Sequence, residues 1–196
     1  MMEVAILTAE QISYAVMLSR MVYDQAVRDK QTDVSVNIFF DEYMNEENIK
    51  RQVEAGVLTI WGICENRQLV AVSGMTNQGH ITMLYVHPYF QRRKYASMLI
   101  EEMRVYAAKE YDIDWITVNA MPTCSATYFY KRGFRYTNPG QNFNSPYISL
   151  QTKSNRCANY RTRPISGKAL AAVISVFLCL IFGSSFGYII YFLVTH

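Results

Sequence analysis

The sequence predicts an α+β domain, a mixed β-sheet flanked by helices, followed by one C-terminal transmembrane helix. Three observations support this prediction. Apolar residues switch between helical and strand periodicity and give the order β-α-α-β-β-β-α-β-α-β-β up to Thr152. A hairpin precedes the central helix, and this mixed order argues against a doubly wound parallel sheet. An uncharged apolar stretch then runs from Ala169 to Val194.

The N-terminal part contains one strand candidate and two helix candidates. Residues Val4 to Leu7 have the composition of a short strand, and apolar residues recur at helical spacing from Ala9 to Val27. Asp41 is expected to cap a second helix that Gly56 ends. Residues 33–40 fit neither pattern clearly, so no element is predicted there.

Three strand candidates follow, and the first two form a predicted hairpin. Leu58 to Glu65 and Leu69 to Met75 are joined by a turn near Asn66 and Arg67, and Ile81 to Val86 is the third strand. The remaining candidates are a strong helix, a strand, a short helix ended by Gly133 and two final strands: Gln91 to Lys109, Trp115 to Ala120, Ser125 to Lys131, Phe134 to Thr137 and Tyr147 to Thr152.

The first candidate for a functional site is the start of the central helix. The run Gln91-Arg92-Arg93-Lys94-Tyr95-Ala96 follows the third strand closely. A helix start presents unpaired backbone N–H groups and the positive end of the helix dipole, and both suit a phosphate or pyrophosphate. Three consecutive cations strengthen that interpretation. A solvated basic helix start without a ligand is the alternative.

Two further features lie later in the chain. Asn119, near the end of a strand, offers an amide that can bond a ligand, although a structural asparagine fits equally well. The aromatic helix before Gly133 carries Tyr128 and Tyr130. A tyrosine hydroxyl that faces a cleft can act as a general acid. Aromatic core packing is the alternative for either tyrosine.

Together these residues resemble the GNAT family of acyl-CoA-dependent N-acyltransferases over about residues 4–152, and the element order is similar as well. The family signature is Gln/Arg-x-x-Gly-x-Gly/Ala after a strand that ends in Val-x-Pro. In this chain Val86-His87-Pro88 precedes Gln91 and Ala96, which match the first and last positions. Lys94 stands where the family has its first glycine. Because helical dihedrals are open to any residue, we expect the turn to form with Lys94 in place.

The family's late Ala-x-x-apolar-Tyr-x-x-x-Gly-Phe pattern is similar to the segment that begins at Ala126, but the segment is one residue shorter. Counting forward from Ala126 places the catalytic tyrosine at Tyr130. Counting back from Gly133 reaches Phe129, which lies between Tyr128 and Tyr130. The resemblance therefore implies Tyr130 as the general acid, with Tyr128 as the alternative.

The resemblance implies that the thioester of acetyl-CoA, or of another acyl-CoA, lies between the strands Ile81 to Val86 and Ile116 to Ala120. Backbone groups of Leu84 and Val86 would hold the pantetheine and polarise the thioester carbonyl, and N–H groups from Arg92 to Ser97 would hold the pyrophosphate. A substrate amine would attack directly, and the tyrosine would protonate the leaving thiolate. The implied cofactor-binding residues are Leu84, Tyr85, Val86, Gln91, Arg92, Arg93, Lys94, Tyr95, Ala96, Ser97 and Asn119.

A general base is not evident in the sequence. Members of the family often have a glutamate near the start of the fourth strand or use ordered water, whereas this sequence offers His80 and no carboxylate there. Histidine has a suitable ordinary pKa. A solvated turn histidine is the alternative. Cys and His show no zinc-ligand spacing, so no metal is expected.

The predicted function is therefore transfer of an acetyl group from acetyl-CoA to a primary amine of an unidentified small molecule or peptide. The alternatives are a non-catalytic acyl-CoA-binding sensor and an adaptor that has lost the cofactor. A net charge of +3 and the lack of a basic block argue against a nucleic-acid partner.

The stretch from Ala169 to Val194 is long enough to span a membrane, since about 26 residues at 1.5 Å each give roughly 39 Å of helix. A basic polar linker, Lys153 to Lys168, precedes it, and no cation other than a terminal histidine follows it. The positive-inside rule then predicts a single-pass protein with domain 1–152 in the cytoplasm and the C-terminus outside. Gly183 and Gly187 form a Gly-x-x-x-Gly step suited to a homodimer in the lipid, with chance as the alternative.

Overall fold

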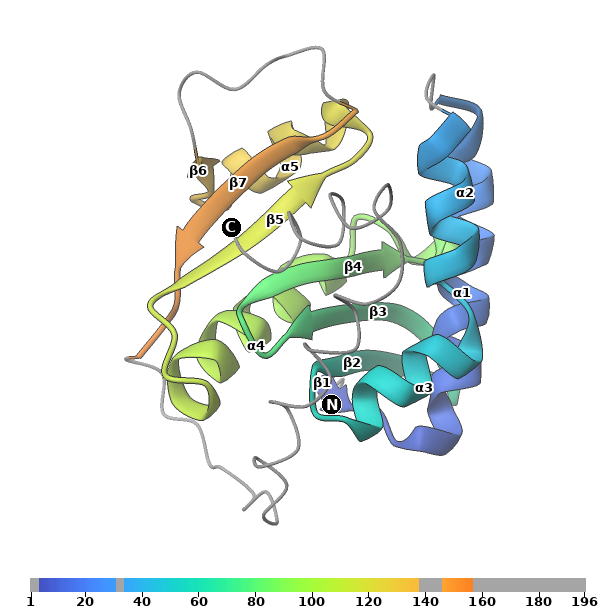
Figure 1. Ribbon diagram of the computed structural model, residues 1–196, viewed down its shortest axis with the longest axis horizontal. Helices are drawn as coiled ribbons and strands as arrows, with labels where there is room; N and C mark the ends of the chain where they lie inside the picture. Colours follow the sequence, from blue (N-terminus) through green and yellow to red (C-terminus); the bar gives the residue numbers. More distant parts are fainter. Residues whose placement is uncertain (1–3, 31–33, 138–145, 157–196) are drawn as a thin grey trace, which may run out of the picture.

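The computed structural model describes residues 4–30, 34–137 and 146–156, and it places seven strands of these residues in one sheet with helices on both faces (Figure 1). The strand order is β1-β2-β3-β4-β5-β7-β6. Neighbouring strands run antiparallel except for β4 and β5, which are parallel. The predicted α+β class with a mixed sheet is confirmed.

Each described strand lies within one residue of its predicted bounds. The turn between β2 and β3 is the predicted one, because Asn66 and Arg67 both have positive φ, 52° and 65°. Two such residues make a type I′ turn, whose twist matches that of the strands it joins. The strands are β1 Val4–Ile6, β2 Leu58–Glu65, β3 Gln68–Thr76, β4 His80–Val86, β5 Trp115–Ala120, β6 Arg135–Tyr136 and β7 Ile148–Lys153.

The helices divide between the two faces of the sheet, and each face buries its own apolar cluster. α1, α2 and α3 cover one face, and α4 and α5 cover the other (Figure 1). Because the central strands are covered on both sides, they read as nearly continuous apolar runs. The helices are α1 Ile12–Ala26, α2 Val34–Tyr43, α3 Glu46–Glu54, α4 Tyr95–Glu110 and α5 Ala126–Tyr130.

The expectation of a single helix capped by Asp41 is wrong. Asp41 lies inside α2, where its carboxylate pairs with Arg28 at 2.7 Å and with Arg20 at 3.2 Å. The break comes at Asn45, whose extended backbone starts α3 and whose side chain accepts a hydrogen bond from the Asn48 N–H at 2.8 Å. This N-cap bond satisfies a backbone donor that the first turn leaves unpaired. The chain between β1 and β2 therefore contains three α-helices in its described residues.

A short segment, residues 154–156, which we term the strap, follows β7 and packs back on the domain. The Asn155 N–H donates to the Arg104 carbonyl at 2.9 Å. The Arg156 guanidinium reaches Asp112 and Asp114, each at 2.8 Å. The described chain therefore ends at a fixed point beside the C-terminal end of α4.

The predicted transmembrane helix Ala169–Val194, most of the linker and the Gly183–Gly187 step lie outside the described residues. Within the part of the chain that the structure describes, no helix has the length and apolar character needed to cross a membrane.

Candidate active site

β4 and β5 pair only at their beginnings. Their parallel register holds two residue pairs, His80 with Thr117 and Ile81 with Val118. Beyond these pairs the two strands separate toward their arrowheads (Figure 1). On its other edge β5 pairs with β7 along its whole length. The sheet therefore opens into a wedge between residues 82–86 of β4 and residues 119–120 of β5.

A β-bulge in β4 coincides with the start of the wedge. The register between β3 and β4 shifts between Gly74 and Met75, so that these neighbours face Met83 and Ile81, and Thr82 faces no residue of β3. A bulge bends its strand and increases the local twist. Because this bulge follows directly after the last pair with β5, it accounts for the divergence of the two strands.

The open edge of β4 presents backbone polar groups to the wedge. His87 donates its N–H to the Val70 carbonyl of β3 at 2.9 Å. Because alternate residues of a strand direct these groups to opposite sides, the N–H and C=O of Leu84 and Val86 face the wedge. The Val86 carbonyl already accepts a bond from the Gln91 side chain at 3.3 Å. An extended ligand with amide groups can pair with the remaining groups much as a strand would.

The segment between β4 and α4 forms a concave row of backbone N–H groups, residues 92–96, which we term the cradle. From Gln91, just before the cradle, to Lys94 the backbone φ alternates in sign. It is −64° at Gln91, +66° at Arg92, not positive at Arg93 and +69° at Lys94. Such alternation turns successive N–H groups inward and makes an anion-binding concavity. The positive end of the α4 dipole adds to the same attraction. The cradle has the chemistry that a pyrophosphate requires.

Three details of the cradle differ from the sequence-based expectation. α4 begins at Tyr95, later than predicted, because Arg92 and Lys94 have left-handed backbone. Lys94 (φ 69°, ψ 6°) therefore does not adopt ordinary right-handed helical dihedrals; it occupies the region that favours glycine, the residue found here in the family signature. The Ser97 N–H bonds to the Lys94 carbonyl at 2.9 Å, so the row of available N–H groups ends at Ala96.

One of the three predicted cations is committed to another contact. Arg93 pairs with the Glu65 carboxylate at 3.0 Å and lies 5.1 Å from the centre of the Phe90 ring. The Tyr95 hydroxyl donates to the same carboxylate at 2.7 Å, which fixes the start of α4 to β2. The side chain of Arg93 is thus a structural contact, whereas Arg92 and Lys94 project into solvent beside the cradle.

Tyr85 and Asn119 do not project toward the cradle. The Tyr85 ring packs edge-on against Phe40 of α2, with centroids 6.5 Å apart, and burial raises its pKa. Val118 packs in the cluster under α4, so its neighbour Asn119 faces the opposite side of the sheet. There the Asn119 side-chain oxygen accepts a bond from the Ser149 hydroxyl at 2.7 Å.

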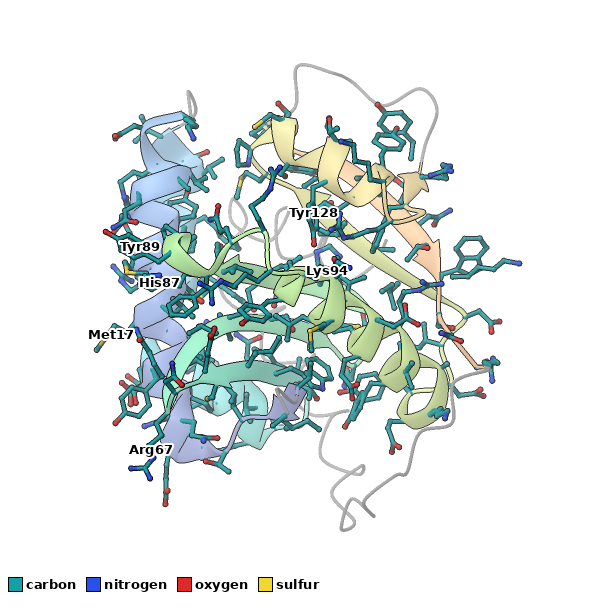
Figure 2. All side chains as sticks on the ribbon, turned by 180° about the vertical axis from the view of Figure 1, so that it is seen from behind. Met17, Arg67, His87, Tyr89, Lys94 and Tyr128 are labelled. Atoms are coloured by element: carbon teal, nitrogen blue, oxygen red, sulfur yellow. The ribbon has the colours of Figure 1, made fainter. Side chains whose placement is uncertain are left out.

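Tyr128 and Tyr130 face opposite sides of α5, since two residues turn a helix by roughly 200°. Tyr128 faces α4 and lies across from Lys94 (Figure 2). Its hydroxyl, like that of Tyr130, is buried and meets no hydrogen-bond partner of normal geometry among the described residues. Tyr130 faces the other way and packs edge-on against Tyr136 of β6, with centroids 5.0 Å apart. The geometry therefore favours Tyr128, the alternative reading of the sequence, as the tyrosine beside the cradle.

The electrostatic environments of the two tyrosines point the same way. Burial raises the pKa of Tyr128, while the Ser97 hydroxyl and the Arg132 guanidinium lower it by less. Burial, followed by the hydrogen bond and charge of Tyr136, raises the pKa of Tyr130 to about 12. An acid that must protonate a thiolate, whose conjugate thiol has an ordinary pKa of about 8.5, is better served by the first environment.

Arg132 is a site residue that the sequence did not indicate. Its Nε and Nη2 donate to the Ser97 hydroxyl at 3.1 and 2.8 Å, and its Nη1 donates to the Tyr128 carbonyl at 3.0 Å. Its guanidinium carbon lies 3.4 Å from the centre of the Tyr128 ring. The sole sequence signal is a basic residue directly before Gly133, which by itself reads as a solvated helix end.

His80 is a buried residue of the sheet, so the expectation of a solvated turn histidine is wrong. It is 7% exposed, and its Nδ1 lies 2.9 Å from the Thr117 hydroxyl. Burial lowers its pKa to about 4, which leaves the ring neutral at neutral pH. Leu84 is four residues further along β4, roughly 13 Å away. His80 is therefore remote from the part of the wedge where a thioester would meet the Leu84 N–H.

Comparison with known proteins gives the family of the chain. A family model for an acetyltransferase (GNAT) domain matches residues 27–151. The chain belongs to the GNAT acetyltransferase family. It is an acyl-CoA-dependent acetyltransferase, and the resemblance that rests on Gln91 and Ala96 is confirmed. The search of curated proteins returned no match to this chain.

Solved structures of GNAT proteins share the fold. The PaiA N-acetyltransferase of Thermoplasma acidophilum in complex with coenzyme A is 14% identical (TM-score 0.66; 78% of this chain, 99% of that one). A GNAT acetyltransferase of Staphylococcus aureus is 17% identical (TM-score 0.62; 79% and 100%). A predicted acetyltransferase of Clostridium acetobutylicum with acetyl-CoA is 21% identical (TM-score 0.56; 74% and 96%). At these identities the similarity concerns the fold and does not identify the acceptor substrate.

Proposed function

We propose that this GNAT protein transfers an acetyl group from acetyl-CoA to a primary amine, which attacks the thioester directly. The observation that carries the proposal is that the wedge leads into the cradle. The open edge of β4 ends at Val86, and the cradle begins at Arg92. Acetyl-CoA is a linear ligand with amides in its pantetheine arm and a pyrophosphate at the end of that arm. The amides match Leu84 and Val86, and the pyrophosphate matches residues 92–96.

The chain's own groups then supply the catalysis. Acyl-CoA brings a thioester whose carbonyl oxygen gains negative charge when an amine attacks. A wedge-facing N–H of Leu84 or Val86 donates to that oxygen, an interaction worth on the order of 3 kcal/mol per donor. Tyr128 donates its hydroxyl proton to the sulfur as the carbon–sulfur bond breaks. We assign removal of the amine proton to water, because His80 is buried, neutral and remote.

The site assignments have a direct kinetic test. The full-length protein in detergent micelles is titrated with acetyl-CoA by calorimetry and assayed for thiol release with polyamines, aminoglycosides and lysine peptides. We expect Tyr128→Phe to lower kcat by ~10²-fold or more, the usual contribution of a general acid. Tyr130→Phe is the matched control on the opposite side of α5. The reverse pattern would refute the assignment, and binding without turnover on any amine would favour the non-catalytic sensor.

We also propose that the stretch Ala169–Val194 anchors the domain in a membrane, with the domain on the cytoplasmic side. The uncharged sequence and the basic residues before it support this proposal. The sheet is completed by β7 before this stretch begins, so we infer that the anchor provides location and the domain provides the chemistry.

The anchor is tested by deleting residues 169–194. We expect the full chain to resist alkaline extraction from membranes and the shortened chain to be soluble with an unchanged kcat. Extraction of the full chain at alkaline pH would contradict the proposed anchor without affecting the assignments in the wedge.

A further inference from the structure

Arg132, two residues after α5, bonds the first turn of α4 directly and also stacks on the ring of Tyr128. Three of its N–H groups are bonded, two to the Ser97 hydroxyl and one to the Tyr128 carbonyl. Between these bonds the guanidinium lies on the face of the Tyr128 ring, 3.4 Å from its centre. Arginine suits this place because its planar fork is always charged and stacks on aromatic rings. The guanidinium therefore cannot leave the ring face without breaking its bonds to Ser97 and to the Tyr128 carbonyl.

The hydroxyl of Tyr128 shows which chemistry this contact serves. It is buried without a partner of normal geometry among the described residues. A buried hydroxyl left unbonded costs free energy, which a ligand atom that accepts its hydrogen bond would recover. The ring thus carries a cation on its face and, at its other end, a hydroxyl without a bond of normal geometry that lies near the Ser97 hydroxyl.

We propose that Arg132 is a positioning residue for acyl transfer, which holds the Tyr128 ring against α4 and stabilises the phenolate that forms when Tyr128 gives up its proton. This inference rests on the proposed role of Tyr128 as general acid. In the step, the nitrogen–carbon bond forms, the carbon–sulfur bond breaks and the Tyr128 proton moves to sulfur. The phenolate then regains a proton from the water that received the amine proton.

Burial and the charge of Arg132 have opposite effects on the pKa of Tyr128. Removing a phenol from water disfavours its phenolate, which makes a buried tyrosine a weaker acid. A cation on the ring face favours the phenolate, because part of the negative charge is then delocalised into the ring. The Ser97 hydroxyl and, after it, Arg132 therefore offset part of the effect of burial on the Tyr128 pKa. Arg135, three residues later in β6, donates to the carbonyls of Phe134 and Tyr130 instead.

The test measures the titration of Tyr128 itself, so it requires no acceptor. Tyrosines are labelled with ¹³C at the ring carbon that bears the hydroxyl, and Y128F identifies the Tyr128 signal. We expect R132Q to raise the Tyr128 pKa by roughly 1–3 units, the usual effect of removing one close cation. The matched control R135Q is expected to leave that pKa unchanged. An unchanged Tyr128 pKa in R132Q would overturn the inference.

Kinetics separate this inference from the proposed function. With any amine that releases thiol, R132Q is expected to lower kcat at least about tenfold, part of the general-acid contribution, with the KM for acetyl-CoA within about twofold. In the Y128F background, R132Q should lower kcat no further. A raised KM with normal kcat would make Arg132 a phosphate contact and overturn the inference. Loss of kcat in Y128F but not in R132Q would overturn it while leaving the acid assignment intact.

If R132Q does not fold, R132K replaces it. The single ammonium of lysine cannot bond Ser97 and cover the ring at once, so the Tyr128 pKa and kcat should move in the same directions by smaller amounts. Wild-type values of both in R132K would overturn the inference.

Discussion

Lys94 has a long side chain on a backbone conformation that favours glycine. Its φ of 69° and ψ of 6° lie in the left-handed region, directly before the first residue of α4. For an L-residue this conformation costs roughly 1–2 kcal/mol, because Cβ approaches the following carbonyl oxygen. Glycine has no such penalty but loses about 0.5–1 kcal/mol more backbone entropy on folding. We therefore predict that Lys94→Gly stabilises the protein by about 0.5–1 kcal/mol.

The neighbouring positions provide matched controls. Arg92 also has positive φ, 66°, so Arg92→Gly is expected to stabilise by a similar amount. Arg93 lies between them without positive φ and is bonded to Glu65. Arg93→Gly therefore loses an ion pair and adds backbone entropy, and we expect it to destabilise by about 1 kcal/mol.

The assay is urea unfolding of residues 1–156, which contain both apolar clusters, followed by circular dichroism. The glycine variants at positions 92 and 94 should be more stable than wild type, and the variant at position 93 should be less stable. A loss of stability in Lys94→Gly, or the same sign at all three positions, would refute the alternating backbone and with it the cradle.

Two further predictions concern residues outside the cradle. Asn45→Ala should destabilise the domain by about 1 kcal/mol, because it removes the N-cap bond to Asn48. Asn45→Asp keeps an acceptor and should not destabilise the domain. Equal losses of stability in urea unfolding of the two variants would contradict the cap. Burial lowers the pKa of His80 to about 4. The folded state should therefore lose stability as the pH falls from 6.5 to 4, because only the unfolded state then binds the proton. Above pH 6.5 His80 should have no effect on stability. His80→Gln should remove this loss of stability, which is on the order of 3 kcal/mol at pH 4. An identical pH dependence of stability in the variant would contradict the burial of His80.

The strands were predictable because their signals are local. Alternating or continuous apolar runs bounded by turn residues mark β2 to β5, and Asn66-Arg67 marks the hairpin. α2 lacked such a signal. Its sequence begins Val-Ser-Val-Asn-Ile, rich in β-branched residues, and leaves Val34 and Ile38 68% and 48% exposed. A helix without a clean apolar stripe reads as neither helix nor strand.

The site was predictable where it depends on the backbone and not where it depends on contacts between distant residues. The order of strand, turn and basic helix start indicated an anion cradle. Arg93 pairs with Glu65, 28 positions earlier, and Arg132 bonds Ser97, 35 positions earlier. The sequence has no local mark for either contact. The choice between Tyr128 and Tyr130 depends on the rotation of α5, which a pattern one residue short does not define.

The central claim is that acyl-CoA lies along the open edge of β4 with its pyrophosphate in the cradle. The most direct measurement is the set of backbone amide shifts in ¹⁵N spectra of residues 1–156, recorded with and without acetyl-CoA. We predict large changes at Leu84, Val86 and residues 92–96. The N–H of His87, which is bonded to β3, should change little. Binding that shifts other amides and leaves these in place, or no binding at millimolar acetyl-CoA, would contradict the account.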